Sequence, residues 1–330
     1  MSANILVTGA AGFVGSAVAA RLAAMGHRVT GCDNFNDYYT PQLKHDRVAA
    51  LLAPAGVACH AVELADQLQV QALFDQIQPT LVVHLAAQAG VRYSLTNPGA
   101  YIQSNLVAFG HMLEACRQHR IEHLLYASSS SVYGANAKVP FSENDTTDSP
   151  VSLYAATKKS NELMAYSYSK LYQLPATGLR FFTVYGPWGR PDMAYFSFTQ
   201  KLLAGQPIPV FAEGLLTRDF TYIDDIVEGV VRLLFKPQPG DAAAVPEAVP
   251  HGVFNIGNHQ PVRVLDFIGA LERVLGVSAH MDFLPMQAGD VPATHADTRK
   301  LRDWVGFAPT TPLETGLGRF AAWYRGWAPR

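Results

Sequence analysis

A glycine-rich segment near the start of the chain restricts the possible folds more than any other feature. Thr8-Gly-Ala-Ala-Gly-Phe-Val-Gly15 follows a short apolar run at 5–8 and precedes a stretch of helical spacing at 15–25. Between a strand and a helix, glycines at this spacing permit a tight turn, let a pyrophosphate approach the backbone, and allow close helix–strand packing. The segment predicts a dinucleotide-binding loop whose contacts come from Gly9, Gly12, Phe13, Val14 and Gly15.

The rest of the first half repeats this alternation of apolar runs and helical stretches. Its spacing predicts further strands at 28–33, 57–62, 80–85, 123–128 and 176–182, helices at 67–76, 101–119 and 154–172, and a late strand at 253–256. Such alternation favours a parallel sheet covered on both faces. We predict an α/β fold: a Rossmann-type doubly wound parallel sheet over 1–183, to which 219–257 returns, and a smaller α/β substrate-binding domain assembled from 184–218 and 258–330. The Pro- and Ala-rich stretch 236–251 is expected to be a surface loop.

The composition narrows the classes of partner. Of 330 residues, 49% are hydrophobic and 16% are charged, the net charge is −2, and no basic run occurs. Such a chain can bury a large core, and it lacks the positive surface that binds nucleic acid or an anionic membrane. Cys32, Cys59 and Cys116 form no CxxC pair and the histidines form no HExxH motif, so neither a disulfide framework nor a metal site is expected.

The apolar segment 5–26 carries a single charge, Arg21, yet it does not have the pattern of a signal peptide. No basic region precedes it, and three glycines interrupt it at the spacing of a phosphate loop. We therefore expect a soluble, cytoplasmic protein.

An acidic residue ends the second predicted strand and indicates which dinucleotide binds. A carboxylate at Asp33 accepts hydrogen bonds from the adenosine ribose hydroxyls and repels the 2′-phosphate of NADP. The following residues, Asn34 and Phe35, provide no arginine for such a phosphate, so NAD is the predicted cofactor. Glu63 and Leu64, after the third strand, are candidates for contact with the adenine or for a solvated loop.

A tyrosine and a lysine one helical turn apart form the candidate catalytic group. Tyr154-Ala-Ala-Thr-Lys158 begins a predicted helix behind a Ser152 cap, so phenol and ammonium lie on one face. A free tyrosine, whose pKa is about 10, is a poor base at neutral pH, and the charges of Lys158 and of a nicotinamide would lower that pKa. The preceding strand ends in Ser128-Ser-Ser-Ser131, at the edge where parallel sheets bind ligands. Ser129, Tyr154 and Lys158 therefore predict an enzyme that takes hydride from a secondary alcohol.

These features together resemble the extended short-chain dehydrogenase/reductase family of nucleotide-sugar epimerases and dehydratases. The resemblance covers essentially the whole chain and rests on the glycine loop, Asp33, the serine run, the Tyr154–Lys158 motif, His84-Leu-Ala-Ala-Gln88 and Arg218-Asp-Phe-Thr-Tyr-Ile-Asp-Asp225. The segments 33–39, 88–94 and 182–193 are most similar to UDP-glucuronate 4-epimerases. The resemblance implies a homodimer and further NAD contacts from Leu85, Ala86, Ala87, Gln88 and Asn105.

The chemistry that the resemblance implies involves no net redox change. Tyr154 removes the proton of the sugar 4-hydroxyl while hydride passes from C4 to the nicotinamide. The 4-keto sugar then presents its other face, hydride returns, and NAD is retained. Because a 4-keto uronate is a β-keto acid, loss of CO₂ competes, and hydrogen-bond donors to the carboxylate oppose that loss.

The substrate contacts are also implied by the resemblance. The uronate pocket would consist of Ser129, Ser130, Ser131, Thr183 and Arg190. Ser131 stands where UDP-glucuronate decarboxylases carry a glutamate, and Thr183 where UDP-glucose 4-epimerases carry an asparagine, which favours interconversion of UDP-glucuronate and UDP-galacturonate.

The nucleotide of the UDP-sugar is expected at a second group of residues. The resemblance places Arg218 on the diphosphate, Asp290 on the uridine ribose and Phe211 beside the uracil. Gln287 stands where UDP-glucose 4-epimerases often have a second diphosphate arginine, so Arg92 is a further candidate for that contact.

Other activities remain open at this level. One alternative is a UDP-glucose 4-epimerase or another NAD-dependent nucleotide-sugar epimerase or dehydratase, and a second is a UDP-glucuronate decarboxylase. Dehydratases usually carry an acidic pair near the catalytic strand, where this chain has Ser130-Ser131. A non-catalytic NAD-binding protein is disfavoured by the joint presence of Ser129, Tyr154 and Lys158.

Overall fold

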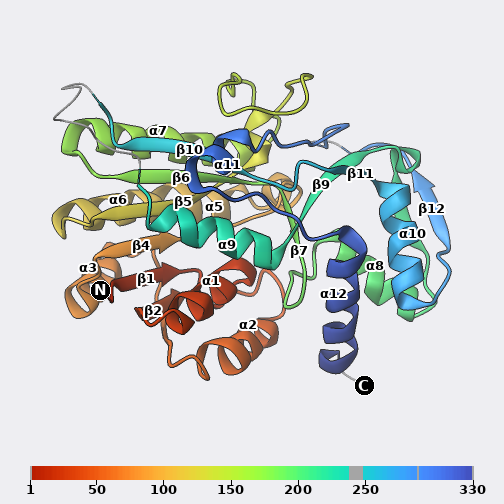
Figure 1. Cartoon of the computed structure of the whole chain (residues 1–330), viewed down its shortest axis with the longest axis horizontal. Helices are drawn as coiled ribbons and strands as arrows, with labels where there is room; N and C mark the ends of the chain where they lie inside the picture. Colours follow the sequence, from red (N-terminus) through yellow and green to blue (C-terminus); the bar gives the residue numbers. More distant parts are fainter. Residues whose placement is uncertain (1, 238–247, 288–289, 329–330) are drawn as a thin grey trace.

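The computed structural model describes residues 2–237, 248–287 and 290–328 and contains a seven-stranded parallel sheet. Its strand order is β10-β6-β5-β4-β1-β2-β3 (Figure 1). The strands are β1 (Asn4–Thr8), β2 (Arg28–Asp33), β3 (Ala58–Ala61), β4 (Leu81–His84), β5 (His123–Ser129), β6 (Ala176–Phe181) and β10 (His251–Ile256). This is the doubly wound order with one strand added beside β6, so the predicted fold class and the late returning strand are confirmed.

Helices cover both faces of this sheet, as the apolar strands require. Because successive side chains of a strand point to opposite faces, Ile5 and Val7 belong to one hydrophobic cluster and Leu6 to another. The first cluster includes residues of α1 (Phe13–Ala24) and α9 (Ile223–Leu234), which pack against each other. The second includes residues of α3 (Gln67–Ile77), α6 (Ala108–Gln118) and α7 (Leu153–Tyr172).

The predicted helix 101–119 is the main local difference from expectation. The chain forms α4 (Tyr93–Thr96), α5 (Pro98–Tyr101), a π-helical turn (Ile102–Val107) and only then α6. The side chain of Asn161, from α7, donates a hydrogen bond of 2.6 Å to the backbone carbonyl of Asn105, within the π-helical turn. A side chain that occupies a helix carbonyl is a known cause of such local widening.

The remaining elements gather at one end of the large sheet (Figure 1). Strands β7 (Thr183–Tyr185), β9 (Thr217–Tyr222) and β11 (Pro261–Arg263) form a second sheet, and β8 (Ile208–Phe211) pairs in parallel with β12 (Met281–Leu284). The helices of this part are α8 (Ala194–Leu203), α10 (Val264–Leu275) and α12 (Leu313–Trp327), whereas α11 (Arg299–Val305) packs against β10 and α9 of the large sheet. Helix α2 (Pro41–Arg47), followed by a π-helical turn (Val48–Leu52), lies after β2 and was not predicted.

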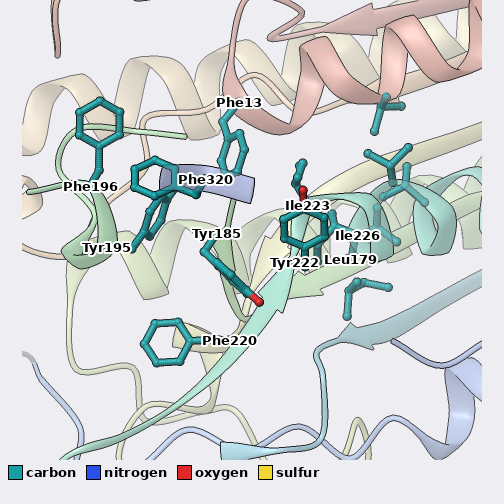
Figure 2. Packing of buried hydrophobic residues seen from close by; sticks show 14 of the residues in the cluster. Phe13, Leu179, Tyr185, Tyr195, Phe196, Phe220, Tyr222, Ile223, Ile226 and Phe320 are labelled. Carbon is teal, nitrogen blue, oxygen red and sulfur yellow. The ribbon is translucent and has the colours of Figure 1, made fainter. Parts of the chain in front are cut away.

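One hydrophobic cluster runs through both predicted domains. Figure 2 shows Phe13 and Leu179 of the NAD-binding part in the same cluster as Phe196 and Phe320 of the smaller part. Packing between the two parts is therefore core packing, which fixes their relative placement. The residue boundaries of the two domains stay a prediction, and most of the expected loop at 236–251 lies outside the described residues.

The apolar segment 5–26 contributes β1, the glycine loop and α1 rather than one long helix. Within residues 2–237, 248–287 and 290–328, the structure contains no helix with the length and apolar character needed to cross a membrane.

Candidate active site

The glycine loop makes the turn between β1 and α1 in a form that a side chain would disrupt. Gly9 has φ +67°, and a Cβ on it would lie 2.7 Å from the backbone nitrogen of Ala86. A Cβ on Gly15 would lie 2.0 Å from the carbonyl oxygen of Gly9. Helix α1 begins at Phe13 without a side-chain cap, so its first N–H groups, which lack intrahelical acceptors, are available to an anion. The loop therefore has the shape and the polarity that a pyrophosphate needs.

The acidic residue predicted to hold the adenosine ribose is buried at the carboxyl end of β2. Oδ1 of Asp33 accepts a hydrogen bond of 2.9 Å from the backbone N–H of Phe35 and lies 3.5 Å from Nζ of Lys44. Beside it, Nδ2 of Asn34 donates to Oε2 of Glu63 at 2.9 Å. Sequence reasoning missed Lys44 because α2, the helix that carries it, was not predicted. The available signal was the stretch 40–47, which directly follows the segment 33–39 and was left unassigned.

Strand β5 and helix α7 bring the predicted catalytic group together. The hydroxyl of Ser152 accepts a hydrogen bond from the backbone N–H of Ala155 at 3.1 Å, which caps α7 as predicted. One turn further along, Nζ of Lys158 donates to the carbonyl oxygen of Ala127, in β5, at 2.9 Å. The side chain of Ser129 lies close enough to the phenol of Tyr154 to lower its pKa, and both residues line the same cavity. The serine hydroxyl, the phenol and the amine therefore lie within one small volume.

Burial dominates the titration of this group. Burial raises the pKa of Tyr154 above its usual value, whereas Ser129 and the charge of Arg190 act in the opposite direction. Burial also lowers the pKa of Lys158 to about 7. In the protein groups alone, desolvation outweighs the lowering effects on the pKa of Tyr154, so a lower pKa produced by Lys158 and the nicotinamide charge together stays a prediction.

A buried ion pair holds α7 against the sheet behind the catalytic group. Nε and Nη2 of Arg180, in β6, each donate to the carboxylate of Glu162, in α7, at 2.8 Å. The hydroxyl of Ser128, in β5, donates to the same carboxylate at 2.6 Å. A bidentate pair with a third donor fixes the relative position of three elements. Glu162 lies one turn after Lys158, so the pair also fixes the height of the amine over β5.

The residues predicted to contact the uronate lie at the end of β5, in the 3₁₀ turn that follows it (Ser130–Tyr133), on β7 and in the loop 186–193. The hydroxyl of Ser129 donates to that of Ser131 at 3.2 Å. Nε and Nη2 of Arg190 donate to Asp192 at 3.0 and 2.5 Å, and the hydroxyl of Tyr38 donates to Asp192 at 3.2 Å. Sequence reasoning did not assign Tyr38 or Asp192, although both lie in segments that carried the family resemblance.

Three charged residues meet at the predicted nucleotide end of the cavity. Asp290 lies 3.5 Å from Nη2 of Arg92 and 3.7 Å from Nη2 of Arg218. The guanidinium of Arg92 also lies 5.2 Å from the centre of the Phe211 ring. The structure thus brings Arg92, the least certain of the predicted contacts, into one cluster with Asp290, Arg218 and Phe211.

One cavity of about 670 Å³, at the carboxyl ends of the large sheet's strands, collects nearly all of the predicted site residues. Its wall includes Gly9, Gly12, Phe13, Val14, Gly15, Asp33, Asn34, Glu63, Leu64, Leu85, Ala86, Ala87, Gln88, Arg92, Ser129, Ser130, Ser131, Tyr154, Lys158, Thr183, Arg190, Phe211, Arg218 and Asp290. A concave site of this size at the strand ends is the usual place for a ligand in such sheets.

Asn105 is the predicted cofactor contact that does not line this cavity. It is buried behind the wall, where its Oδ1 accepts from the backbone N–H of Gln88 at 2.8 Å and its Nδ2 donates to the carbonyl of Gln88 at 3.0 Å. The same Nδ2 donates to Thr157, in α7, at 3.0 Å. Its side chain therefore holds Gln88 and α7 in place, and a direct contact of Asn105 with the cofactor stays a prediction.

A doubly wound sheet with a dinucleotide loop at one end of a cavity and a Ser–Tyr–Lys group at its centre defines the class of short-chain nicotinamide-dependent enzymes. The model of the NAD dependent epimerase/dehydratase family matches residues 5–257. The chain belongs to this family.

Similar proteins agree with this assignment along the full length of the chain. The chain is 47% identical over 327 residues to a probable UDP-glucuronate 4-epimerase of Rhizobium meliloti (strain 1021), which covers 97% of this chain and 96% of that protein. It is 49% identical over 331 residues to UDP-glucuronate 4-epimerase 3 of Arabidopsis thaliana, covering 98% and 77%. A crystal structure of UDP-glucuronic acid 4-epimerase from Bacillus cereus in complex with UDP-glucuronic acid and NAD superposes with a TM-score of 0.87, at 33% identity, covering 98% and 99%.

Proposed function

We propose that the chain is a UDP-glucuronate 4-epimerase that interconverts UDP-glucuronate and UDP-galacturonate and retains NAD as its cofactor. The observation that carries the proposal is the place of Arg190, which lines the same cavity as Tyr154 and whose charge lowers the pKa of that phenol. In a uronate, the carboxylate is attached to C5, next to the reacting C4. A guanidinium beside the base for the 4-hydroxyl is thus well placed for an acidic sugar. The names of the Rhizobium and Arabidopsis relatives support the same substrate.

The residues at the first end of the cavity fit NAD. The unsubstituted Cα atoms of Gly9 and Gly15 and the uncapped start of α1 would hold the pyrophosphate. The carboxylate of Asp33 would accept hydrogen bonds from the adenosine ribose and repel a 2′-phosphate. When bound, NAD supplies the acceptor for hydride from C4 and the donor that returns it.

Tyr154 is the group we assign to proton transfer at the sugar 4-hydroxyl. Ser129 lies beside the phenol in the same cavity, so its hydroxyl can polarise the reacting oxygen. Lys158 is held by the carbonyl of Ala127 one helical turn away, and its charged form stabilises the phenolate. Because both pKa values are shifted by burial, removal of water from this pocket and the charges bound in it control when the phenol can act as a base.

The serine run accounts for epimerisation in preference to loss of CO₂. Ser131 places a neutral hydroxyl where an acidic side chain would repel the uronate, and its own hydroxyl accepts a hydrogen bond from Ser129. Donors from this run and from Arg190 keep negative charge on the carboxylate oxygens. Decarboxylation requires that charge to flow toward the C4 carbonyl, so these contacts oppose it.

The charged cluster at the far end suits the UDP group. Arg218 and Arg92 would bind the diphosphate oxygens, for which a planar guanidinium is well shaped. Asp290, which lies between the two arginines, would accept hydrogen bonds from the uridine ribose. The aromatic face of Phe211 would lie beside the base.

The proposal is tested by supplying UDP-glucuronate as the sole substrate to the purified protein and following the products by NMR. We expect UDP-galacturonate without added NADH and with little CO₂. A Tyr154→Phe variant should lose about a thousandfold in turnover, because the proton acceptor is removed. As a binding control, that variant should retain the affinity of the parent for UDP.

Three outcomes would overturn or redirect the proposal. Accumulation of a nucleotide pentose would identify a decarboxylase. Faster turnover of UDP-glucose than of UDP-glucuronate would identify an epimerase of neutral sugars. A Tyr154→Phe variant as active as the parent would remove Tyr154 from the chemistry altogether.

We also propose that the protein is a cytoplasmic homodimer. Helix α7 exposes Leu163, Tyr166, Leu171 and Tyr172, with fractional exposures of 56, 48, 71 and 51%. Exposed apolar side chains gathered on one helix are typical of protein interfaces. Cys32, Cys59 and Cys116 are free thiols, as is usual in a reducing compartment. Sedimentation velocity on the parent and on a Leu163→Glu/Tyr166→Glu variant tests the interface: the parent should be a dimer and the variant a monomer.

A further inference from the structure

A buried arginine outside the cavity bridges the two loops that the proposed reaction needs. Arg47, the last residue of α2, has a side chain with no exposed surface. Its Nη1 donates to the carbonyl of Ala11 at 3.0 Å and to the hydroxyl of Tyr39 at 2.7 Å. Its Nε donates to the carbonyl of Trp188 at 2.9 Å, and its Nη2 to the carbonyl of Gly189 at 3.0 Å. Among the described residues, no carboxylate forms an ion pair with Arg47. Its charge is therefore stabilised by hydrogen bonds to neutral oxygens.

The two ends of this bridge have different functions. Ala11 is the middle of the glycine loop, between Gly9 and Gly12. Trp188 and Gly189 immediately precede Arg190, which we assign to the uronate. Arg47 therefore connects the backbone that would hold the pyrophosphate of NAD with the backbone that carries the uronate-binding guanidinium.

The loop before Arg190 has a conformation that requires support from outside. Trp188 has φ +65°, in the left-handed region that side chains rarely adopt. A Cβ on Gly189 would lie 1.7 Å from the hydroxyl oxygen of Tyr195. Two consecutive residues are thus held in unusual positions, and both of their carbonyls accept hydrogen bonds from Arg47. Loss of those bonds would leave buried carbonyls unsatisfied and free the loop to relax.

The same loop is also held from a neighbouring segment. Tyr39 accepts a hydrogen bond from Arg47, while the preceding residue, Tyr38, donates to Asp192, the partner of Arg190. The segment that follows Asp33 therefore touches the loop 186–193 before and after Arg190.

We propose that Arg47 is a positioning residue: it couples the dinucleotide loop to the loop 186–193 and so sets the place of Arg190 for a uronate. This inference rests on the proposed function. Arginine is required because its planar fork reaches four acceptors in different directions, which the single ammonium of a lysine cannot do. Loss of the bridge displaces Arg190 while the UDP contacts at Arg218, Asp290 and Phe211, on other elements, stay in place.

The test compares binding of two ligands to the NAD-loaded protein by calorimetry. In an Arg47→Lys variant, the Kd for UDP-glucuronate should rise by about tenfold to a hundredfold, since small displacements of a positioning group have effects of this size. The Kd for UDP, which has no uronate, should change less than about twofold. In turnover, KM for UDP-glucuronate should rise more than kcat falls.

A second variant and a control keep the test decisive. Tyr39→Phe removes only one acceptor of Arg47 and should give a smaller rise in the same direction. Asp46→Ala, at the neighbouring position, removes the acceptor of a 2.8 Å hydrogen bond from the Trp327 indole and should lower Tm without altering the ratio of the two Kd values.

The outcomes separate this inference from the proposed function. An Arg47→Lys variant that binds UDP-glucuronate like the parent, or that loses both ligands equally, would overturn the positioning role. A parent protein that does not turn over UDP-glucuronate would overturn the proposed function instead.

Discussion

The two ends of the cavity are formed by different kinds of groups, backbone atoms at one end and long side chains at the other. At the dinucleotide end, Gly9 and Gly15 bring backbone atoms so close together that no side chain fits, and the start of α1 provides the polarity. At the uridine end, long side chains form the site and bond to each other, as Asp290 does with Arg92 and Arg218. The first end has one arrangement fixed by sterics, whereas the second has charges that can exchange partners.

This difference indicates how each end obtains its selectivity. A backbone cradle recognises a group common to all dinucleotides, and a single carboxylate, Asp33, then selects NAD. At the other end, each arginine has an internal carboxylate partner, so a ligand must replace an existing ion pair. Only a ligand with negative charge in matching places makes that exchange favourable. We therefore expect substitutions to abolish function at the first end and to alter substrate preference at the second.

The largest effect is expected for Gly15→Ala. The added Cβ would lie 2.0 Å from the carbonyl oxygen of Gly9, so β1 and α1 must separate. Overpacking of this kind costs about 1–3 kcal/mol or more, and here it also deforms the pyrophosphate loop. We expect the purified variant to contain no NAD and to have no turnover. Absorbance of the denatured protein's supernatant measures the bound cofactor, and thermal unfolding measures stability.

Gly318→Ala is the matched control for that variant. Gly318 lies in α12, and nothing lies within 4 Å of the position of an added Cβ. Because alanine is the better helix former by about 1 kcal/mol, stability should be equal or slightly higher, with normal NAD content. A Gly15→Ala protein that kept its NAD would contradict the steric account of the first end.

The next largest effect is expected for Lys158→Met, at the junction of the two ends. Without the ammonium, the phenolate of Tyr154 loses its stabilising charge, so turnover should fall about a hundredfold and the acid limb of its pH profile should move to higher pH. The free energy of unfolding should rise in the same variant. Burial lowers the pKa of Lys158 from 10.5 to about 7. The unfolded chain therefore binds more protons between these pH values, so the buried lysine destabilises the parent most at pH 7 and below.

Thermal unfolding at two pH values tests the sign of this linkage. The Met variant should gain Tm relative to the parent at pH 7, and the gain should shrink by pH 10, where the lysine is neutral in the folded state and has begun to lose its proton in the unfolded chain. A gain that grows with pH would contradict the direction of the shift.

The sequence was sufficient to predict those parts of the molecule that follow from local pattern. The order of strands and helices, Ser152 as a cap, and the group of Ser129, Tyr154 and Lys158 depend on periodicity and on short spacings, which tertiary contacts did not override. The π-helical turn over 102–107 was not predictable, because it depends on Asn161, whose side chain arrives from another helix.

The parts that sequence reasoning missed depend on contacts between distant segments. Lys44 and Arg47 lie on α2, a short helix whose side chains contact Asp33 and the loop 186–193. Asn105 was assigned to the cofactor, but its bonds to Gln88 and Thr157 place it behind the wall. The sign of the pKa shift of Tyr154 could not be predicted either, because it depends on how deeply the phenol is buried.

Arg190→Gln should show the effect expected of a charged side chain in the uronate pocket, which lies between the two ends. Loss of the charge should raise KM for UDP-glucuronate about tenfold to a hundredfold, as for other hydrogen bonds to ionised groups, and leave the affinity for UDP unchanged. Because the charge of Arg190 lowers the pKa of Tyr154, the acid limb of the turnover profile should move to higher pH. Steady-state kinetics across pH measure both effects.

A double variant separates two causes of that loss. In Arg190→Gln, the carboxylate of Asp192 loses its partner and would itself repel a uronate. Arg190→Gln/Asp192→Asn removes this repulsion and should recover part of the lost affinity. If the double variant were no better than the single one, attraction by Arg190 would account for the whole effect.

The smallest effect is expected for Tyr38→Phe, which tests whether the dinucleotide side of the cavity supports the uronate pocket. Tyr38 belongs to the dinucleotide side, yet its hydroxyl donates to Asp192 at 3.2 Å and so steadies the partner of Arg190. A neutral donor to a carboxylate contributes about 1 kcal/mol, so KM for UDP-glucuronate should rise about fivefold while NAD content stays constant. Tyr93→Phe is the matched control, because the tilted ring of Tyr93 lies 4.8 Å from that of Tyr38 but its hydroxyl bonds to Asn97 instead. An equal rise in both variants would mean that loss of a hydroxyl from this aromatic pair, and not the hydrogen bond to Asp192 in particular, causes the effect.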